Sequence, residues 1–187
     1  MPVRGRDNTR AIPGKALRGK GLILINPEVA HDWRLPWDGG CRCGRVRIRV
    51  TAPPLVTMAC HCRGCQRMSA SAFSLSAAIP AEGFAVTEGE PVVGGLHGAS
   101  RHFFCGWCMS WMFTRPEGMD WFVNLRPTML DDPSWFEPLV ETYVAEKLPW
   151  AVTGAPHGFA TVPEEGAFPA LIAEYAARGP RVRKVSS

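Results

Sequence analysis

The sequence predicts a mainly β domain with a few short helices, one of them near the C-terminus. Three observations support this class: short segments in which polar and apolar residues alternate, frequent turns rich in glycine and proline, and seven cysteines that gather at such turns. A chain of 187 residues is long enough to bury one hydrophobic core. We therefore expect one domain with terminal extensions.

The clearest strand signal lies in residues 45–50, where arginine alternates with β-branched residues. This alternation is typical of a half-buried strand, and the arginines are expected to face solvent. Pro53 and Pro54 end the segment. Further strands are predicted over residues 55–59, 72–79, 84–87, 102–104, 111–113, 121–125 and 139–145, the last being expected to close the sheet.

A helix is predicted near the C-terminus. Pro169 is placed where a helix can begin, and Leu171, Ile172 and Tyr175 recur at helical spacing. Gly179 and the proline after it end the pattern. We interpret this helix as a peripheral addition to the β domain.

The charge pattern divides the chain. Residues 1–20 hold six lysines and arginines against one aspartate, residues 178–187 hold four and no acid, and the segment between has eleven basic and sixteen acidic side chains. A nucleic-acid-binding domain is expected to carry a basic stripe on its folded surface. The basic ends are therefore interpreted as solvated tails, and the pattern argues against a nucleic-acid partner.

These patterns give an expected organisation: a partly disordered N-terminal extension over residues 1–36, a zinc-binding β domain over residues 37–151, and a C-terminal extension with the short helix and a basic tail over residues 152–187. No apolar run approaches the roughly 20 residues that span a bilayer. The arginines at the start precede no apolar segment of a secretory signal. We expect a cytoplasmic protein with no membrane partner.

The cysteines form three groups: Cys41 and Cys43; Cys60, Cys62 and Cys65; Cys105 and Cys108. An odd number of cysteines cannot form a closed set of disulfides, and clustered thiols in a reducing compartment are typical of metal sites. Tetrahedral zinc takes four protein ligands in a closed structural site and three in an open catalytic site. Seven cysteines therefore predict two zinc ions, one closed and one open.

The partition between the sites follows only in part from spacing. The middle group can hold one ion by itself, which leaves the two outer pairs to share a second ion that closes a long loop. A redox pair at Cys105 and Cys108, an iron–sulfur cluster, and closure of the middle site by His61, His97 or His102 are alternatives. His61 lies between two ligands, so we expect it to point away from the metal.

The cysteine groups and the segments around them resemble those of a known family, the glutathione-dependent formaldehyde-activating enzymes, also called the centromere protein V-like family. The resemblance covers about residues 37–151 and rests on Gly39-Gly40-Cys41-Arg42-Cys43-Gly44-Arg45-Val46, Cys60-His61-Cys62-Arg63-Gly64-Cys65-Gln66-Arg67, Phe104-Cys105-Gly106-Trp107-Cys108, Leu130-Asp131-Asp132-Pro133 and Leu148-Pro149-Trp150. It implies a mainly antiparallel β zinc domain. It also implies a structural zinc on Cys41, Cys43, Cys105 and Cys108 and a catalytic zinc on Cys60, Cys62 and Cys65.

The implied activity is a carbon–sulfur lyase reaction in which formaldehyde and glutathione form S-hydroxymethylglutathione. Arg63 and Arg67 are candidates to bind the carboxylates of glutathione or another small thiol, although a solvated face explains them equally well. Many members carry other residues where this chain has Ala70, Glu141 and Tyr143. A second hypothesis is a non-catalytic module in which both zinc ions are structural and the surface docks a protein or nucleic acid.

Four aromatic residues are expected to pack in the core, because aromatics in alternating strands usually cover a sheet. They are Trp107, Trp111, Trp121 and Phe122.

Overall fold

The computed structural model describes residues 33–95 and 98–180, and within these ranges no helix is long and apolar enough to cross a membrane. The strands are β1 (Trp37–Gly40), β2 (Arg47–Val50), β3 (Val56–Cys60), β4 (Ser74–Pro80), β5 (Phe84–Glu88), β6 (Pro91–Gly94), β7 (Ser100–Cys105), β8 (Trp111–Pro116), β9 (Phe122–Leu125), β10 (Val140–Thr142) and β11 (His157–Gly158). The helices are α1 (Arg63–Ser69) and α2 (Phe168–Arg178), with single turns η1 (Ala81–Gly83), η2 (Pro127–Met129), η3 (Val144–Glu146) and η4 (Glu165–Ala167). The predicted mainly β class is confirmed.

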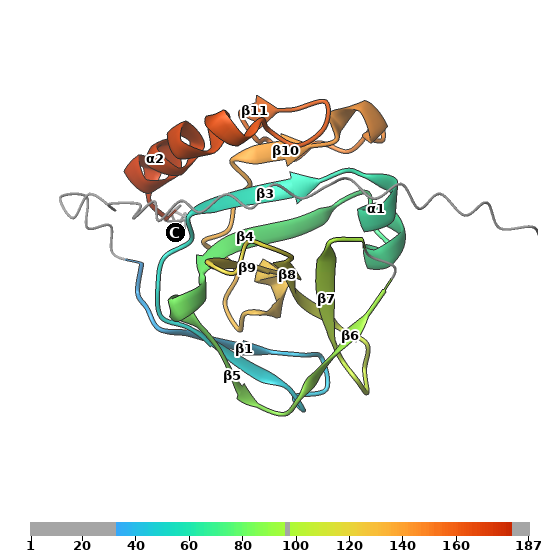
Figure 1. Cartoon of the computed structure of the whole chain (residues 1–187), viewed down its shortest axis with the longest axis vertical. Coiled ribbons are helices and arrows are strands. Elements are labelled where there is room, and N and C mark those ends of the chain that lie inside the picture. Colours follow the sequence, from blue (N-terminus) through green and yellow to red (C-terminus); the bar gives the residue numbers. More distant parts are fainter. Residues whose placement is uncertain (1–32, 96–97, 181–187) are drawn as a thin grey trace, which may run out of the picture.

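The strands form two sheets (Figure 1). The smaller sheet has the order β1-β2-β5, and the larger one has the order β11-β10-β3-β4-β9-β8-β7-β6. Every pairing between consecutive neighbours is antiparallel except those of β10, which runs parallel to both β3 and β11. The sheets are therefore mainly antiparallel, as the resemblance implies.

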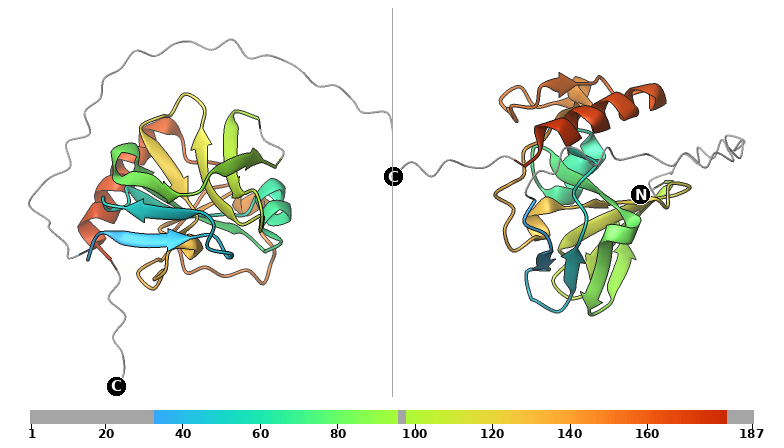
Figure 2. Two further views of the ribbon diagram at one scale, coloured as in Figure 1. Left: turned by 90° about the horizontal axis from the view of Figure 1, so that it is seen from below. Right: turned by 90° about the vertical axis from the view of Figure 1, so that its left-hand side faces the viewer.

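The first hydrophobic core lies between the two sheets. Ile48 and Val50 of β2 are fully buried against Ile79, Val123 and Leu125 of the large sheet. The arginines of β2 alternate with these residues and are half-buried or exposed, as the sequence predicted. The period of two in this segment thus places its apolar side chains in the space between the sheets. Figure 2 shows the ribbons of both sheets from two further sides.

The second hydrophobic core lies on the other face of the large sheet and is covered by α2 (Figure 1). Leu171 and Tyr175 of α2 are buried there with Val56 and Val140. The helix begins and ends within one or two residues of its predicted limits. Its interpretation as a peripheral addition is wrong, because an amphipathic helix with two buried side chains closes this core.

Two other expectations need correction. Trp107 and Trp121 are exposed by 69% and 50%, because both lie in turns at strand ends, whereas Trp111 and Phe122 are buried as predicted. The strand expected over residues 139–145 is only three residues long, and the short β11 follows it. The N-terminal segment up to residue 32 and the basic residues 181–187 lie outside the described residues, but Trp33 packs against both cores.

Candidate metal centres

Four cysteines converge where the turn between β1 and β2 meets the turn between β7 and β8. The sulfur atoms of Cys41, Cys43, Cys105 and Cys108 all lie within 4.8 Å of one another. The Sγ atoms of Cys41 and Cys43 are 3.5 Å apart, and those of Cys43 and Cys105 are 3.7 Å apart. The structure thus brings together the outer cysteine pairs that the sequence assigned to one site.

Local contacts fix both turns. The backbone N–H of Val46 donates to the sulfur of Cys41 over 3.3 Å, and the N–H of Arg42 donates to the hydroxyl of Ser110 on the opposite turn over 3.2 Å. The hydroxyl of Ser110 also lies 3.3 Å from the sulfur of Cys108 and, by hydrogen bonding to the thiolate, lowers the pKa of Cys108 to about 5. This arrangement favours the thiolate form that a metal ion binds.

The second group consists of Cys60, Cys62 and Cys65, which we call the cysteine triad. Its sulfur atoms also lie within 4.8 Å of one another. The sequence predicted a turn here, but the segment is the end of β3 followed by α1. Cys62 is the N-cap of α1 and accepts the backbone N–H of Cys65 over 3.4 Å. The short helix brings Cys65 back over the strand end that carries Cys60.

Hydrogen bonds within the triad shift the pKa values of its thiols. The S–H of Cys65 bonds to the sulfur of Cys60 and lowers the pKa of Cys60 to about 5, and the same contact raises the pKa of Cys65. The Thr142 hydroxyl also bonds to Cys60, and Ser74 bonds to Cys65. Both hydroxyl residues flank Cys60 in the sheet, where Cys60 pairs with Ser74 in β4 and with Thr142 in β10.

His61 points away from the triad, as predicted, but it does not face water. Its side chain is fully buried, and its Nε2 atom lies 3.1 Å from the Oε1 atom of Glu141. Glu141 also accepts two bonds from the Lys147 ammonium, at 2.6 and 2.8 Å, and one from Thr153 at 2.7 Å. Burial raises the pKa of Glu141, but these donors outweigh burial and hold the pKa below its ordinary value.

A further polar contact ties α1 to the segment after β10. The side-chain amide of Gln66 donates to the backbone carbonyls of His61, over 2.6 Å, and Glu146, over 3.0 Å. The backbone N–H of Arg63 donates to the Glu146 carboxylate over 2.7 Å. Together with the buried contact of His61, these bonds fix the loop that carries the triad. Apart from the local bond between Gln66 and His61, these contacts join residues about 80 positions apart, so they were not foreseen from the sequence.

Arg126 is the most unusual side chain near the triad. It is only 9% exposed and lies directly after β9, on the same sheet face as Ser74. Its guanidinium stacks on the Trp111 ring at 3.9 Å and donates to Leu75, Thr114 and, over 3.3 Å, the Ser74 hydroxyl. Burial lowers the pKa of Arg126 to about 10, while the charges of Cys65 and Cys60 act in the opposite direction. The group is therefore charged at neutral pH.

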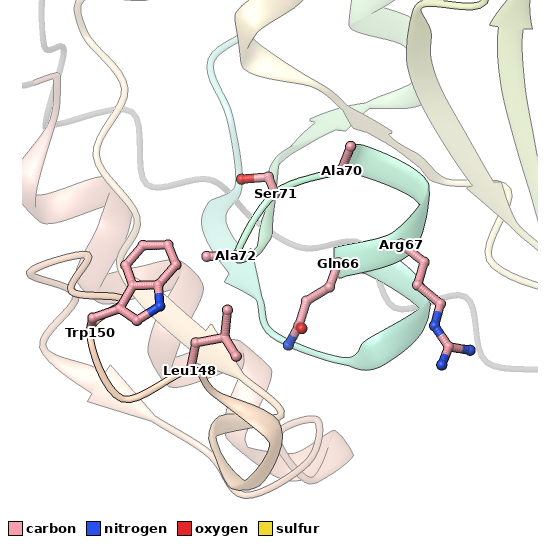
Figure 3. A pocket seen from close by; sticks show the side chains of 7 residues that line it. All are labelled: Gln66, Arg67, Ala70, Ser71, Ala72, Leu148 and Trp150. Carbon is pink, nitrogen blue, oxygen red and sulfur yellow. The ribbon is translucent and has the colours of Figure 1, made fainter.

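Arg63 and Arg67 are both exposed on α1. The Arg63 guanidinium donates to Gln66 over 3.1 Å. Arg67 lines an open cavity of about 570 Å³ between α1 and the segment after η3 (Figure 3). The cavity is also lined by Gln66, Ala70, Ser71, Ala72, Leu148 and Trp150. In Figure 3 Gln66 points towards Leu148, whereas Arg67 projects from another side of the helix.

Both cysteine groups fit metal ions. Tetrahedral zinc with Zn–S bonds near 2.3 Å needs sulfur atoms roughly 3.8 Å apart, and the sulfur separations in the first group approach this value. Among the described residues no histidine, aspartate or glutamate joins the triad as a fourth ligand. His61 is engaged with Glu141, His102 lies 2.9 Å from the Thr114 hydroxyl, and His97 falls outside the described residues.

The comparisons with known proteins identify a family for this chain. A search of curated proteins gave no match. Among solved structures, the chain is similar to a crystal structure of a Rhodobacter sphaeroides protein, with 20% identity, coverage of 50% of this chain and 87% of that one, and a TM-score of 0.43. The family model described as "Glutathione-dependent formaldehyde-activating enzyme" matches residues 36–146, which is more than half of the chain and includes all seven cysteines. The chain belongs to the family of glutathione-dependent formaldehyde-activating enzymes.

Proposed function

We propose that this protein is a zinc-dependent enzyme of the carbon–sulfur lyase type, similar to S-hydroxymethylglutathione synthase, that combines a small thiol such as glutathione with an aldehyde. The proposal includes two Zn²⁺ ions per chain, a structural one on Cys41, Cys43, Cys105 and Cys108 and an open one on the triad. Residues 37–151 form the proposed catalytic domain. The observation that carries the proposal is the convergence of three thiols without a fourth protein ligand among the described residues.

The reaction itself requires little chemistry. The thiol sulfur forms a bond to the aldehyde carbon, the carbonyl double bond becomes a single bond, and the thiol proton ends on the new hydroxyl group. No electron acceptor or donor is needed. Cys60, Cys62 and Cys65 would hold a zinc ion, which would supply an open coordination position for a thiol and lower the pKa of that thiol.

The chain's own residues would position the reactants. Ser74 bonds to Cys65 and Thr142 bonds to Cys60, so these hydroxyl groups hold two of the triad thiols at the end of β3. Tyr143 follows Thr142 in the chain, and its hydroxyl is neutral at pH 7, because burial raises its pKa and the triad thiols raise it further. Arg67 and the cavity beside α1 provide a positive charge and a space of about 570 Å³ for a peptide-sized thiol. Arg63 is the second proposed carboxylate partner, because it lies on the same short helix.

Protection from alkylation tests the proposed thiol site. Zinc-loaded protein is treated with iodoacetamide with and without saturating glutathione, and modified cysteines are identified by peptide mass spectrometry. Because free glutathione also consumes iodoacetamide, labelling in every sample is normalised to that of an added reference peptide with one cysteine. We expect glutathione to slow the labelling of Cys60, Cys62 and Cys65, because a bound thiol fills the open position. S-methylglutathione, which keeps both carboxylates but has no thiol, is the matched control and should protect much less. Equal labelling under all three conditions would contradict the thiol site.

A kinetic assay separates the enzyme from the alternative, a non-catalytic zinc module. Exchange of formaldehyde between its free and glutathione-bound forms is measured by NMR, because the uncatalysed reaction sets a background rate. The wild type should accelerate this exchange, and Cys62→Ser should return it to the background. A wild type that binds two zinc ions yet never exceeds the background favours the binding module.

A further inference from the structure

Arg126 carries a buried positive charge near the triad that has no role in the reaction proposed above. Among the described residues it is the only arginine or lysine whose side chain is buried, and it forms no ion pair with a carboxylate. Its Nε atom is buried without any hydrogen-bond partner in the structure. Removing such a charge from water is costly unless a negative group lies close by.

The groups near Arg126 that can carry a negative charge are two of the triad thiols, Cys65 and Cys60. The side chains of Cys60, Ser74 and Arg126 lie on one face of the large sheet, because Cys60 pairs with Ser74 and Arg126 continues the alternation of β9 beside β4. The Ser74 hydroxyl contacts both Arg126, at 3.3 Å, and the Cys65 thiol. One hydroxyl group therefore separates the guanidinium from a metal ligand.

The net charge of the metal-loaded triad determines how the Arg126 guanidinium affects the fourth ligand. Three thiolates and one divalent ion carry a net charge near −1, and a fourth ligand that is an anion brings it to −2. In a partly buried site such a charge is unfavourable, because interactions between charges are stronger away from water. A fixed positive charge offsets the added anion but has little effect on a neutral fourth ligand.

We propose that Arg126 makes the triad site selective for an anionic fourth ligand, a deprotonated thiol, over a neutral one. This role rests on the proposed function, since it concerns the thiol that the open site binds. Arg126 acts through charge across Ser74 and does not itself bind the metal. Arg63 and Arg67 cannot replace it, because their exposed charges are screened by water and salt.

The test compares ligand affinities in four proteins loaded with Co²⁺, whose visible spectrum reports the ligands at the triad while the four-cysteine site stays constant. The first two are the wild type and Arg126→Gln, which keeps hydrogen-bond donors but loses the charge. The third is Arg126→Lys, which keeps the charge. Arg101→Met, at an exposed position of β7, is the matched control for loss of an arginine. The probes are glutathione, mercaptoethanol, azide and imidazole.

We expect Arg126→Gln to bind glutathione, mercaptoethanol and azide about tenfold more weakly or worse, and imidazole with nearly unchanged affinity. Arg126→Lys and Arg101→Met should stay close to the wild type. An equal loss for imidazole would mean that the substitution damages the site as a whole, and a loss for glutathione alone would mean that Arg126 binds a carboxylate; either result overturns the proposal.

Two further outcomes distinguish a failure of the proposed function from a failure of the role proposed for Arg126. If the wild type binds azide but no thiol, the proposed function fails, and the azide affinities of the variants still test Arg126. If Arg126→Gln does not fold, Arg126→Lys decides: a tenfold loss of azide affinity in this folded, charged variant contradicts the role of charge, and retained affinity supports it.

Discussion

Replacing Cys105 by serine should destabilise the fold much more than replacing Cys62. Cys105 is 1% exposed, and its sulfur lies 3.7 Å from that of Cys43, a residue 62 positions earlier in the chain. An ion that joins them acts as a cross-link on a long loop. If this cross-link is treated like a disulfide, closing a loop of this length contributes about 4 kcal/mol to the free energy of unfolding.

The triad closes a much shorter loop. Cys60 and Cys65 are five residues apart, for which the same relation gives about 2 kcal/mol. Cys62→Ser should cost even less, because serine keeps an N-cap oxygen for α1. A domain of this size loses roughly 2–4 °C in Tm per kcal/mol. We therefore expect Cys105→Ser to lower the Tm by about 8–16 °C and Cys62→Ser by less than about 8 °C.

The assay is thermal unfolding of zinc-loaded proteins followed by circular dichroism, with the metal content of each variant measured by native mass spectrometry. Cys105→Ser should lose one ion together with much of its stability. Cys62→Ser should keep one ion and a cooperative transition. If Cys62→Ser unfolds at the lower temperature, the structural and open sites have been assigned the wrong way round.

Three other predictions follow from the fold and the buried polar contacts. Leu171→Ala should lower the free energy of unfolding by about 2–5 kcal/mol, measured by urea denaturation, whereas Ala173→Ser on the exposed side of α2 should have almost no effect; equal effects would contradict the role of α2 in the second core. Glu141→Gln should destabilise the fold at pH 7 by about 1–3 kcal/mol, because the half-buried Lys147 ammonium loses its charged partner. Since the pKa of Glu141 in the fold lies below the ordinary value of 4.5, its stabilising effect is complete above that pH and is lost as the pH falls through the lowered value. Urea denaturation between about pH 5 and pH 3 should thus show a steeper loss for the wild type than for Glu141→Gln, and parallel curves would refute this.

The fold class and the cysteine grouping could be predicted from the sequence because both depend on short-range patterns. Alternation in residues 45–50 fixes which side chains of β2 face the core, and the spacing within each cysteine group limits which thiols can share an ion. The C-terminal helix was located for the same reason, since Pro169, helical spacing and Gly179 all act locally. What it covers depends on the sheet, and this was not predicted.

The surroundings of the triad could not be predicted, because they come from strand register. Ser74, Thr142 and Arg126 meet only when β4 lies between β3 and β9 and β10 adds parallel to β3. Arg126 directly follows a strand with alternating residues. The alternation predicts on which face of the sheet the Arg126 side chain lies, but not which residues of other strands it contacts. In the sequence Glu141 is only one residue of a predicted strand. Its contact with His61 joins residues 80 positions apart, so the sequence does not predict it.

The central claim is that one chain holds a closed four-cysteine site and an open three-cysteine site that accepts a thiol. Cadmium NMR of the cadmium-substituted protein tests it most directly, because each site gives its own resonance and the shift reports the number of sulfur ligands. The account predicts two resonances, of which one moves towards the four-sulfur range when glutathione is added and is missing in Cys62→Ser. A single resonance, or two that glutathione leaves unchanged, would contradict it.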